Sequence, residues 1–496
     1  MTQRVDDPVV TVPVPGTGTR TSTPADVDGA VDRARRAFTQ WSALSARDRA
    51  RLMLDVRRRI LARVDDVVDT IVAETGKLSV EAVVSEVFVA CEEITYYAKH
   101  APGFLAPERV RPGIFAHKRA EKRFEPLGVV GVISPWNYPF VLSTGPVMGA
   151  LFAGNAVVLK PSEFTPGVGV LIGDLVAEAG LPRGVVEVVT GDGTVGEALV
   201  RSPVAKICFT GSVRTGRAVA RAAADNLTPV LLELGGKDPL IVCRDADLDR
   251  AARAAVWGGF SNCGQTCIAT ERVYVVEDVY DSFVDKVVNL TAAVRQGSGP
   301  GHDVGAMTHA GQTQIVMDHL ADAVERGATV ATGGTSVLVG GRPSVTPTVL
   351  VDVDHSMAVM RDETFGPVLP VMKVRDEDEA LALANDSPFG LSASVFGKDP
   401  TTIERLVAGL RTGSVCVNDV MVSFAMPGLP FGGARDSGSG LAHGPEGLRE
   451  FTRVKSVARD RAGLRREPMW FPVPRSLERL ARGAMRLRYG LGRHAR

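Results

Sequence analysis

The chain has 496 residues, 45% hydrophobic and 23% charged, which is an ordinary globular composition and enough for two or three domains. Lysine plus arginine equals aspartate plus glutamate at 57 each, so no overall basic field would recruit nucleic acid. No apolar run approaches the ~20 residues of a membrane span, and the N-terminal residues lack the apolar core of a signal peptide.

The first hundred residues predict an arm followed by helices. Residues 1–25 are irregular in pattern, and residues 25–100 have helical periodicity. Ser45 with Asp48 three residues later resembles a capping box at a helix start. Residues 110–123, rich in Pro, Gly and alternating side chains, predict a hairpin or connecting strands.

From residue 128 to residue 242, short apolar runs of strand type alternate with helical stretches such as 166–179 and 213–224. This alternation predicts an α/β fold with a parallel sheet and right-handed crossovers. Open sheets of this kind bind ligands at the carboxyl ends of their strands, where Gly, Pro, Ser and Thr cluster in this chain. A second alternating region covers residues 272–418.

Six cysteines are spread along the chain at too low a density for a disulfide scaffold, which favours a reducing, cytoplasmic setting. Only Cys263 and Cys267 lie close together. They have neither a second cysteine pair nor a histidine cluster nearby, so we expect no metal site and interpret Cys263 as a packing residue.

Cys267 lies in the turn-prone run FSNCGQTCIA (260–269), just ahead of a strand-like segment at 272–276. Glu233 lies 34 residues upstream in the apolar run VLLELGG, where a carboxylate costs solvation energy unless it has a partner or a use. A thiol that attacks a carbonyl and a carboxylate that activates water convert an aldehyde into an acid through a thioester. We therefore predict Cys267 as nucleophile and Glu233 as general base, against a structural cysteine and a solvent-facing carboxylate.

Asn137 lies in the Pro-flanked turn SPWNYPF. Its amide could donate to the oxygen that becomes negative when a thiolate adds to a carbonyl, a contribution of roughly 3 kcal/mol for one donor. The alternative is an asparagine that stabilises its own turn.

Three segments predict a nucleotide site. Phe209 to Ser212 ends a strand and opens a helix, where backbone amides bind pyrophosphate. Residues 191–196, including Gly193, match G-x-G-x-x-G, a weak signal because the chain has 52 glycines. Lys160 and Glu163 follow another strand. A carboxylate there accepts both hydroxyls of an adenosine ribose and repels a 2′-phosphate, although an exposed loop pair is equally compatible.

Seven motifs occur together: SPWNYP, LKPSE, FTGS, LELGGKDP, NCGQTC, ETFGP, and PFGG followed by SGSG. In combination they resemble the aldehyde dehydrogenase superfamily over residues 20–458, nearest to bacterial members grouped with succinate-semialdehyde dehydrogenases. The resemblance implies an α/β fold with a Rossmann-like cofactor domain, an α/β catalytic domain and a small oligomerisation hairpin, in a homodimer or homotetramer. The implied boundaries are 1–104 and 126–235 for the cofactor domain, 236–440 for the catalytic domain, 105–125 and 441–458 for oligomerisation, and 459–496 for a basic tail.

The resemblance also implies roles for individual residues. Asn137 and the Cys267 amide would form an oxyanion hole, and NAD would be the cofactor, because relatives that prefer NADP often carry a small residue in place of Glu163. The implied cofactor contacts, with Gly193 from the glycine motif, are Ile133, Trp136, Lys160, Glu163, Gly193, Phe209, Ser212, Gly235, Glu363 and Phe365. The implied aldehyde contacts, which plain core residues would also satisfy, are Tyr138, Val141, Thr266, Ile268, Phe424 and Phe431.

Alternatives remain at the level of substrate and chemistry. The mainly apolar contact positions favour an aliphatic or aromatic aldehyde. The arginine that succinate-semialdehyde enzymes often carry after the Asn137 motif is missing from PFVLSTGPV. Glu233 favours hydrolysis over transfer to coenzyme A, and the retained Cys267, Glu233 and Asn137 disfavour a non-catalytic binding protein on the same scaffold. Many relatives have Glu where this chain has His443, so any proton relay through that position would differ.

The C-terminal tail is basic, with eleven arginines between residues 458 and 496. Residues 475–489 place Leu477, Leu480, Ala484 and Leu487 on one helical face and arginines on the others. Such a helix can lie on an anionic membrane as a peripheral contact, or it can pack on the enzyme or a partner. Both interpretations, and disorder, stay open.

Overall fold

The apolar runs of the first half of the chain form a six-stranded sheet in the computed structural model, which describes residues 21–467 and 469–490. Most of the predicted N-terminal arm lies outside the described residues. The sheet order is β17-β7-β6-β3-β4-β5. Its strands are β3 (Val129–Ile133), β4 (Ala156–Lys160), β5 (Val186–Val188), β6 (Lys206–Thr210), β7 (Val230–Glu233) and β17 (Gly438–Ser439).

The five strands from β3 to β7 are parallel, and only β17 pairs antiparallel, with β7. Numbered in chain order, these five strands lie 3-2-1-4-5 across the sheet, which is the Rossmann order without its sixth strand, and the first strand, β3, lies beside the fourth, β6. The switch in strand order therefore lies between β3 and β6, and it opens a crevice at their carboxyl ends.

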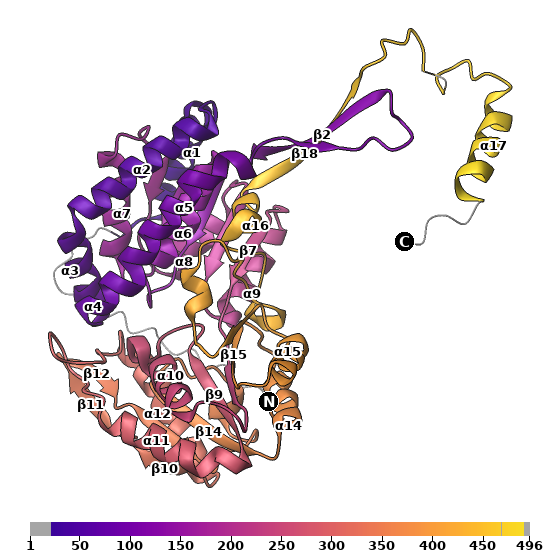
Figure 1. Cartoon of the computed structure of the whole chain (residues 1–496). Helices are drawn as coiled ribbons and strands as arrows, with labels where there is room; N and C mark the ends of the chain where they lie inside the picture. The colour runs from indigo at the N-terminus through magenta and orange to yellow at the C-terminus, as the bar shows by residue number, and fades with distance from the viewer. Residues whose placement is uncertain (1–20, 468, 491–496) are drawn as a thin grey trace, which may run out of the picture. The chain divides into compact units, whose positions relative to one another are not determined.

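Helices cover both faces of this sheet, as the fully buried strands β3 and β4 require. On one face α1 packs on α8, and α8 packs on α9 (Figure 1). On the other face α6 and α7 lie under α2. The helices are α1 (Pro24–Ser42), α2 (Ala46–Ala62), α3 (Val64–Thr75), α4 (Ser79–Glu81), the π-helix η1 (Ala82–Phe88), α5 (Val89–Phe104), α6 (Val141–Ala153), α7 (Pro166–Glu178), α8 (Gly193–Arg201) and α9 (Val213–Ala224).

The predicted helical character of residues 25–100 is confirmed by α1 to α5. Ser45 is the N-cap of α2, and its hydroxyl accepts from the Asp48 amide. The same hydroxyl donates to the Asp48 carboxylate at 2.6 Å, so Asp48 is satisfied by the cap side chain rather than by the reciprocal backbone bond of a capping box.

The second half of the chain forms a separate seven-stranded sheet of order β10-β13-β14-β9-β8-β15-β16. All neighbours in it are parallel except β10 and β13, which confirms the α/β character expected from the second alternating region. Its strands are β8 (Asp238–Val242), β9 (Thr270–Val276), β10 (Thr329–Thr332), β13 (Thr348–Val351), β14 (Val368–Val374), β15 (Ser392–Phe396) and β16 (Ser414–Val417), with a hairpin of β11 (Ser336–Val339) and β12 (Arg342–Val345).

Each sheet has its own buried apolar core, and the change from one core to the other falls between Leu234 and Leu240. The segment that joins the two sheets, residues 234–240, therefore lies at the boundary between the two cores. The helices of this half are α10 (Leu248–Phe260), η2 (Ser261–Gly264), η3 (Glu277–Val279), α11 (Tyr280–Ala292), α12 (Ala310–Glu325), α13 (Ala358–Arg361), α14 (Glu377–Asn385), α15 (Pro400–Gly409), η4 (Val422–Ala425), η5 (Arg435–Ser437) and α16 (Gly444–Arg449).

A second compact unit comprises residues 107–123 and 454–496. The predicted hairpin is confirmed, because β1 (Glu108–Val110) pairs antiparallel with β2 (Lys118–Pro126), and β18 (Thr452–Asp460) completes a three-stranded sheet. The tail contains α17 (Leu477–Tyr489), whose side chains are exposed apart from a half-buried Leu477. Among the described residues no helix combines the length and the apolar character that crossing a membrane requires.

Candidate functional site

A cleft of about 780 Å³ lies at the strand-order switch of the first sheet. It collects eight of the predicted residues from segments far apart in the sequence: Trp136, Asn137, Ser212, Glu233, Gly235, Cys267, Glu363 and Phe365. Ser212 is the N-cap of the 12-residue helix α9, so a helix N-terminus opens on the cleft.

The loop that carries Cys267 is built on a left-handed turn. Asn262, Cys263 and Gly264 have φ values of 53°, 56° and 72°. A Cβ on Gly264 would lie 2.2 Å from the Gly366 carbonyl oxygen, so only glycine fits there. Cys263 is fully buried, as expected for a packing residue, whereas Cys267 is partly exposed at the cleft.

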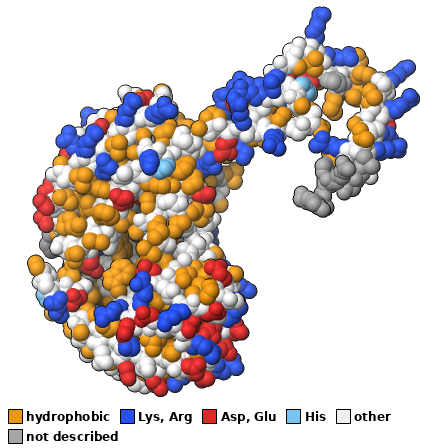
Figure 2. Space-filling view, in the orientation of Figure 1, with side chains coloured by type: hydrophobic (Ala, Val, Ile, Leu, Met, Phe, Trp, Pro, Cys, Tyr) orange, Lys and Arg blue, Asp and Glu red, His pale blue; other side chains and the backbone are white. Residues whose placement is uncertain are grey.

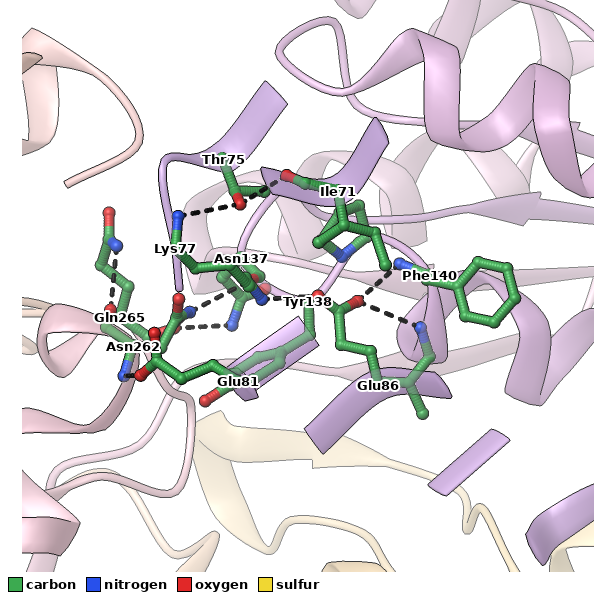
Figure 3. A network of polar contacts seen from close by, with 12 residues as sticks. Ile71, Thr75, Lys77, Glu81, Glu86, Asn137, Tyr138, Phe140, Asn262 and Gln265 are labelled. Atoms are coloured by element: carbon green, nitrogen blue, oxygen red, sulfur yellow. Dashed lines mark hydrogen bonds and ion pairs between the residues drawn. The ribbon is translucent and has the colours of Figure 1, made fainter. Parts of the chain in front are cut away.

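The turn that carries Asn137 is fixed by a buried polar network (Figure 3). The Asn137 carbonyl oxygen accepts from Lys77 Nζ at 2.8 Å and from Asn262 Nδ2 at 2.9 Å. Asn137 Nδ2 donates to the Gln265 carbonyl at 3.0 Å. Since a side-chain amide has two N–H groups, one bond fixes the Asn137 rotamer and leaves the second donor for a ligand oxygen.

A buried ion pair supports this turn from behind. Lys77 Nζ lies 2.5 Å from Glu86 Oε1, and both side chains are 0% exposed. Glu86 Oε2 accepts from the Phe140 amide at 2.7 Å and from the Val141 amide at 3.3 Å. Glu86 comes from the π-helix η1, a form that often occurs at functional sites. Lys77 and Glu86 thus form a pair, and each also bonds the backbone next to Tyr138. Lys77 bonds Asn137, which precedes Tyr138, and Glu86 bonds Phe140 and Val141, which follow it.

Glu233 ends β7 and is buried, so the interpretation as a solvent-facing carboxylate is wrong. Neither of its carboxylate oxygens has a hydrogen-bond partner within the described part of the chain. Burial, followed by the neighbouring Glu450, raises the pKa of Glu233 well above its ordinary value. A buried carboxyl group without a partner in a cleft is a sign of function, because structural carboxylates are paired.

Burial also raises the pKa of the Cys267 thiol, and the neighbouring carboxyl groups of Asp238, Glu363 and Glu233 add to the effect. In the free chain the thiol is therefore protonated at neutral pH, and thiolate chemistry needs a base nearby.

The loop that carries Glu363 and Phe365 is held by a second buried ion pair. Lys237 Nζ lies 2.5 Å from Glu271 Oε2, and the two Glu271 oxygens accept from the Thr364 amide at 2.8 Å and the Phe365 amide at 2.9 Å. Glu363 accepts from the Gly236 amide at 3.1 Å, and burial raises its pKa to about 8.

The cleft fits the cofactor that the sequence resemblance implies. The Phe365 ring lies 5.4 Å from the Trp136 ring in an edge-on arrangement, and both rings line the cleft. The aromatic wall is suited to a planar ring, and the N-terminus of α9 is suited to a phosphate group.

The remaining predicted cofactor positions lie around the cleft rather than on its lining. Ile133 and Phe209 are register partners at the carboxyl ends of β3 and β6. Lys160 Nζ lies 3.4 Å from Glu163 Oε2 at the end of β4, the next strand across. Gly193 begins α8, whose N-cap is Asp192.

The predicted aldehyde contacts converge on two further cavities that also reach Cys267. A tunnel of about 940 Å³ is lined by Tyr138, Val141, Thr266, Ile268 and Phe424 among others. An inner cavity of about 750 Å³ is lined by Val141, Phe424 and Phe431, and also by Glu233. Each of these positions borders a cavity at Cys267, and Val141, Ile268 and Phe431 also belong to buried apolar clusters.

Two buried titratable side chains, those of His443 and Glu93, also line the inner cavity. His443 is buried with Nδ1 unpartnered among the described residues, and burial lowers its pKa to about 4, so the imidazole is uncharged at neutral pH. Glu93 of α5 lines the same cavity, and burial raises its pKa to about 7.

Several structural residues were not predicted from the sequence: Lys77, Glu86, Glu93, Gln265, Glu271 and His309. The imidazole of His309 stacks on Phe164 at 4.3 Å and meets the Trp136 edge at 4.8 Å. A charged residue inside an apolar helical pattern, as at Glu86, was the available signal, but its partner could not be read from the sequence.

The fold and cleft define an α/β oxidoreductase whose thiol adjoins a dinucleotide-type crevice. The chain belongs to the aldehyde dehydrogenase family, whose model matches residues 7–457. It is 43% identical over 471 residues to a protein of Methylomonas sp. named 4,4'-diapolycopene aldehyde oxidase, covering 95% of this chain and 88% of that one. It is 37% identical over 487 residues to a Mycobacterium ulcerans protein provisionally named as an NADP(+)-dependent succinate-semialdehyde dehydrogenase, covering 97% and 92%.

Among solved structures, the chain is similar to an NAD-dependent aldehyde dehydrogenase from Sinorhizobium meliloti, with a TM-score of 0.86, 36% identity, and coverage of 91% of this chain and 89% of that one. The protein is therefore an enzyme that oxidises aldehydes with a nicotinamide cofactor, on the α/β fold that the sequence predicted.

Removing the Lys77 cation is expected to displace the Asn137 turn and to leave Glu86 as an uncompensated buried charge. We expect Lys77→Met to lower kcat by about 100-fold, because the Asn137 side chain is carried by the turn that shifts. The measurement is steady-state kinetics beside thermal unfolding. Lys99→Met, at an exposed lysine of α5, is the matched control.

Because an unpaired Glu86 can itself unfold the chain, Lys77→Met with Glu86→Gln provides a second test. This double variant removes both charges but does not restore the donor to the Asn137 carbonyl. A folded double variant with wild-type kcat would contradict the positioning role.

The raised pKa of the Cys267 thiol predicts the pH dependence of its reactivity. The thiolate fraction should keep growing about tenfold per pH unit above pH 8, where an ordinary thiol approaches full ionisation. We expect the rate of iodoacetamide labelling at Cys267, followed by mass spectrometry in the free enzyme, to rise up to at least about pH 10. A plateau below pH 8 would show that the thiol is acidified instead.

Proposed function

We propose that Cys267 is the nucleophile, Glu233 the general base, and Asn137 with the Cys267 amide the oxyanion donors of a hydrolytic aldehyde dehydrogenase. The observation that carries this proposal is that Cys267, Asn137 and Glu233, from three distant segments, line one cleft at the strand-order switch. The buried carboxylate without a partner and the thiol beside it supply the base and the nucleophile that the reaction needs.

In the first chemical step the Cys267 thiol loses its proton through Glu233 to solvent, and the sulfur forms a bond with the aldehyde carbon. The carbonyl oxygen becomes negative and accepts from Asn137 Nδ2 and the Cys267 amide, each donor contributing roughly 3 kcal/mol. When bound, the nicotinamide accepts the hydride that leaves the carbon and so supplies the oxidation. Trp136 and Phe365 orient its ring, and the substrate remains on Cys267 as a thioester.

Glu233 completes the cycle. Its carboxylate takes a proton from water, and the water oxygen attacks the thioester carbon. The carbon–sulfur bond then breaks, the sulfur leaves as thiolate, and the carboxylic acid is released. Because burial raises the pKa of Glu233, its carboxylate is a stronger base than an exposed glutamate. Loss of its proton to solvent resets the site.

For the cofactor we propose NAD rather than NADP. Relatives and solved neighbours include users of both, so the preference must come from residues of this chain. Glu163, at the end of β4, presents a carboxylate that accepts ribose hydroxyls and repels a 2′-phosphate. Lys160 lies beside it at 3.4 Å and supports the carboxylate geometry.

For the substrate we propose an apolar aldehyde, of the kind named for the Methylomonas relative. The tunnel to Cys267 is lined mainly by aliphatic and aromatic side chains, and none of its described lining residues is Lys or Arg. Its one charged residue is Asp419, so the carboxylate of succinate semialdehyde would meet an anion and no cation. This disfavours the succinate-semialdehyde alternative.

For domain roles and assembly, we propose residues 1–104 and 126–235 as the cofactor domain and 236–440 as the catalytic domain, supported by the two separate cores. We propose that 105–125 and 441–458 join subunits in a cytoplasmic homodimer or homotetramer. Residues 441–453, including α16, belong to the first unit with α5 and α6, so only part of the second segment lies on the hairpin.

We also propose that the tail contacts anionic membranes. The described residues of the second unit contain sixteen Arg and Lys against five Asp and Glu, although the whole chain is neutral. On α17 the exposed Leu480 and Leu487 lie with Leu477 on one side, while Arg479, Arg482 and Arg486 occupy the other. A basic helix with an exposed apolar face is suited to the interface of an anionic bilayer.

The catalytic roles predict different defects for the two central residues. Cys267→Ala should form no NADH from decanal. Glu233→Gln should give one burst of NADH per site and then a steady rate lowered at least about 100-fold, because the thioester is no longer hydrolysed. Stopped-flow absorbance measures both, with the exposed Glu404→Gln as control. Wild-type turnover by Cys267→Ala would refute the assignment, and acyl-CoA as product would show the acylating alternative.

The cofactor proposal predicts that Glu163→Ser raises kcat/KM for NADP about tenfold and lowers that for NAD, because charge repulsion at the 2′-phosphate is removed. Glu197→Ser, at an exposed glutamate of α8, should change neither value. Unchanged cofactor preference in Glu163→Ser would place the selectivity elsewhere.

The tail proposal predicts that the full chain co-sediments with vesicles containing phosphatidylglycerol and that a chain ending at Ala458 does not. Leu480→Asp with Leu487→Asp should abolish binding while keeping all tail arginines. Arg479→Glu with Arg482→Glu should weaken it in a salt-dependent way. Equal binding by the shortened chain would reject the proposal.

A further inference from the structure

The tunnel to Cys267 continues into a wider surface groove. The groove encloses about 1380 Å³ and is lined by residues of α4, η1, α10 and α11. Tunnel and groove share five lining residues, which mark where one passes into the other: Val84, Ser85, Tyr138, Trp257 and Ser261. The two cavities therefore adjoin at these residues, so an extended molecule whose end reaches Cys267 would leave the tunnel beside the groove.

The groove is apolar in chemistry as well as in shape. Its aliphatic and aromatic lining residues are Val80, Val84, Val256, Trp257, Phe260, Leu290, Ala293, Val294 and Val304. Val80, Val84 and Trp257 are 58%, 57% and 55% exposed. Phe88, which lies with Val84 in the π-helix η1, is also exposed. Exposed apolar side chains gathered at the mouth of a site mark a binding surface rather than random surface composition. Figure 2 shows hydrophobic side chains gathered across the middle of the first unit.

Its acidic residues are already engaged. Glu81 accepts from the Asn262 and Leu78 amides at 2.7 and 3.1 Å. Asp303 is paired with the Arg295 guanidinium through both of its oxygens at 3.0 Å. Tyr138 Oη is bonded to Thr266 Oγ1 at 2.9 Å. Arg253, an exposed residue of α10, is the one cation among the described lining residues, and the rest of the surface left to a ligand is mainly hydrocarbon.

We propose that this groove binds the distal part of a long apolar aldehyde whose reactive end lies at Cys267. The inference rests on the proposed function and adds chain length as the property that the enzyme selects. The occupant is a hydrocarbon chain because the groove adjoins the aldehyde tunnel, and because no acidic group in its lining is free to bind a polar ligand. Each methylene that enters the groove raises kcat/KM about threefold.

Trp257 is the residue on which this selection depends. It lines the tunnel, the groove and a third surface pocket beside Asn418, so its ring lies where the chain leaves the tunnel. It comes from α10, whose next residues form the turn before Cys267, but it contacts none of the catalytic hydrogen bonds described above. Its replacement should therefore change binding of long chains and leave the chemistry intact.

The experiment measures kcat/KM for straight-chain aldehydes from butanal to tetradecanal, below their solubility limits and without detergent. Wild type should rise with chain length through the whole series. Trp257→Ser should stay within about twofold of wild type for butanal and lose about tenfold or more for tetradecanal. Leu338→Ser, at a residue that is 74% exposed on β11 and lines neither cavity, should match wild type throughout. Val84→Ser provides the same test if Trp257→Ser does not fold.

Several results would overturn the inference. One is a wild-type plateau at hexanal or octanal; another is an equal loss for short and long aldehydes in Trp257→Ser. A change in oligomeric state of Trp257→Ser by light scattering would assign the groove to a subunit contact instead. Absence of NADH formation from every aldehyde in wild type would refute the proposed function itself, whereas turnover of short aldehydes with no effect of Trp257 would refute only the groove.

Discussion

The arrangement of the site depends on one backbone carbonyl, that of Asn137, which accepts from a buried lysine and a buried asparagine. Lys77 Nζ, from the first half of the chain, and Asn262 Nδ2, from the second half, donate to the same oxygen. Because a buried lysine is tolerated only with its partner Glu86 in place, the turn cannot shift without exposing an unpaired charge. The Asn137 turn and the cysteine loop are thus fixed relative to each other by one network.

A second buried ion pair holds another loop beside the cleft. Lys237 and Glu271 form another buried pair, and Glu271 bonds the amides of Thr364 and Phe365. Two ion pairs therefore fix two loops by their backbones and leave the functional side chains free. Glu233 is the contrast, since its buried oxygens have no partner among the described residues. The carboxylates of Glu86 and Glu271 are saturated by their lysines and by backbone amides, whereas that of Glu233, the proposed base, is not.

The cavities through which a substrate would reach Cys267 are apolar, whereas the turns around Cys267 are held by polar networks. The tunnel and the groove beyond it are mainly hydrocarbon and their acidic groups are engaged, so affinity there comes from apolar area, which grows with chain length. A long apolar aldehyde partitions into bilayers. An enzyme that takes such a substrate gains from a basic, amphipathic helix like α17, which would keep it at the surface where the substrate is concentrated.

The sequence alone determined the α/β fold, and it predicted Cys267, Glu233 and Asn137 as catalytic residues and an apolar character for the positions around Tyr138. It could do so because strand and helix periodicity, glycine turns and short motifs are local properties of the chain. Only the tertiary structure decided that Lys77 pairs with Glu86, that Glu271 holds the Phe365 loop, that His443 is a buried neutral group, and that Trp257 joins tunnel to groove. These features depend on contacts between segments that are separate in sequence, and burial, partners and cavities exist only once the two sheets have packed together.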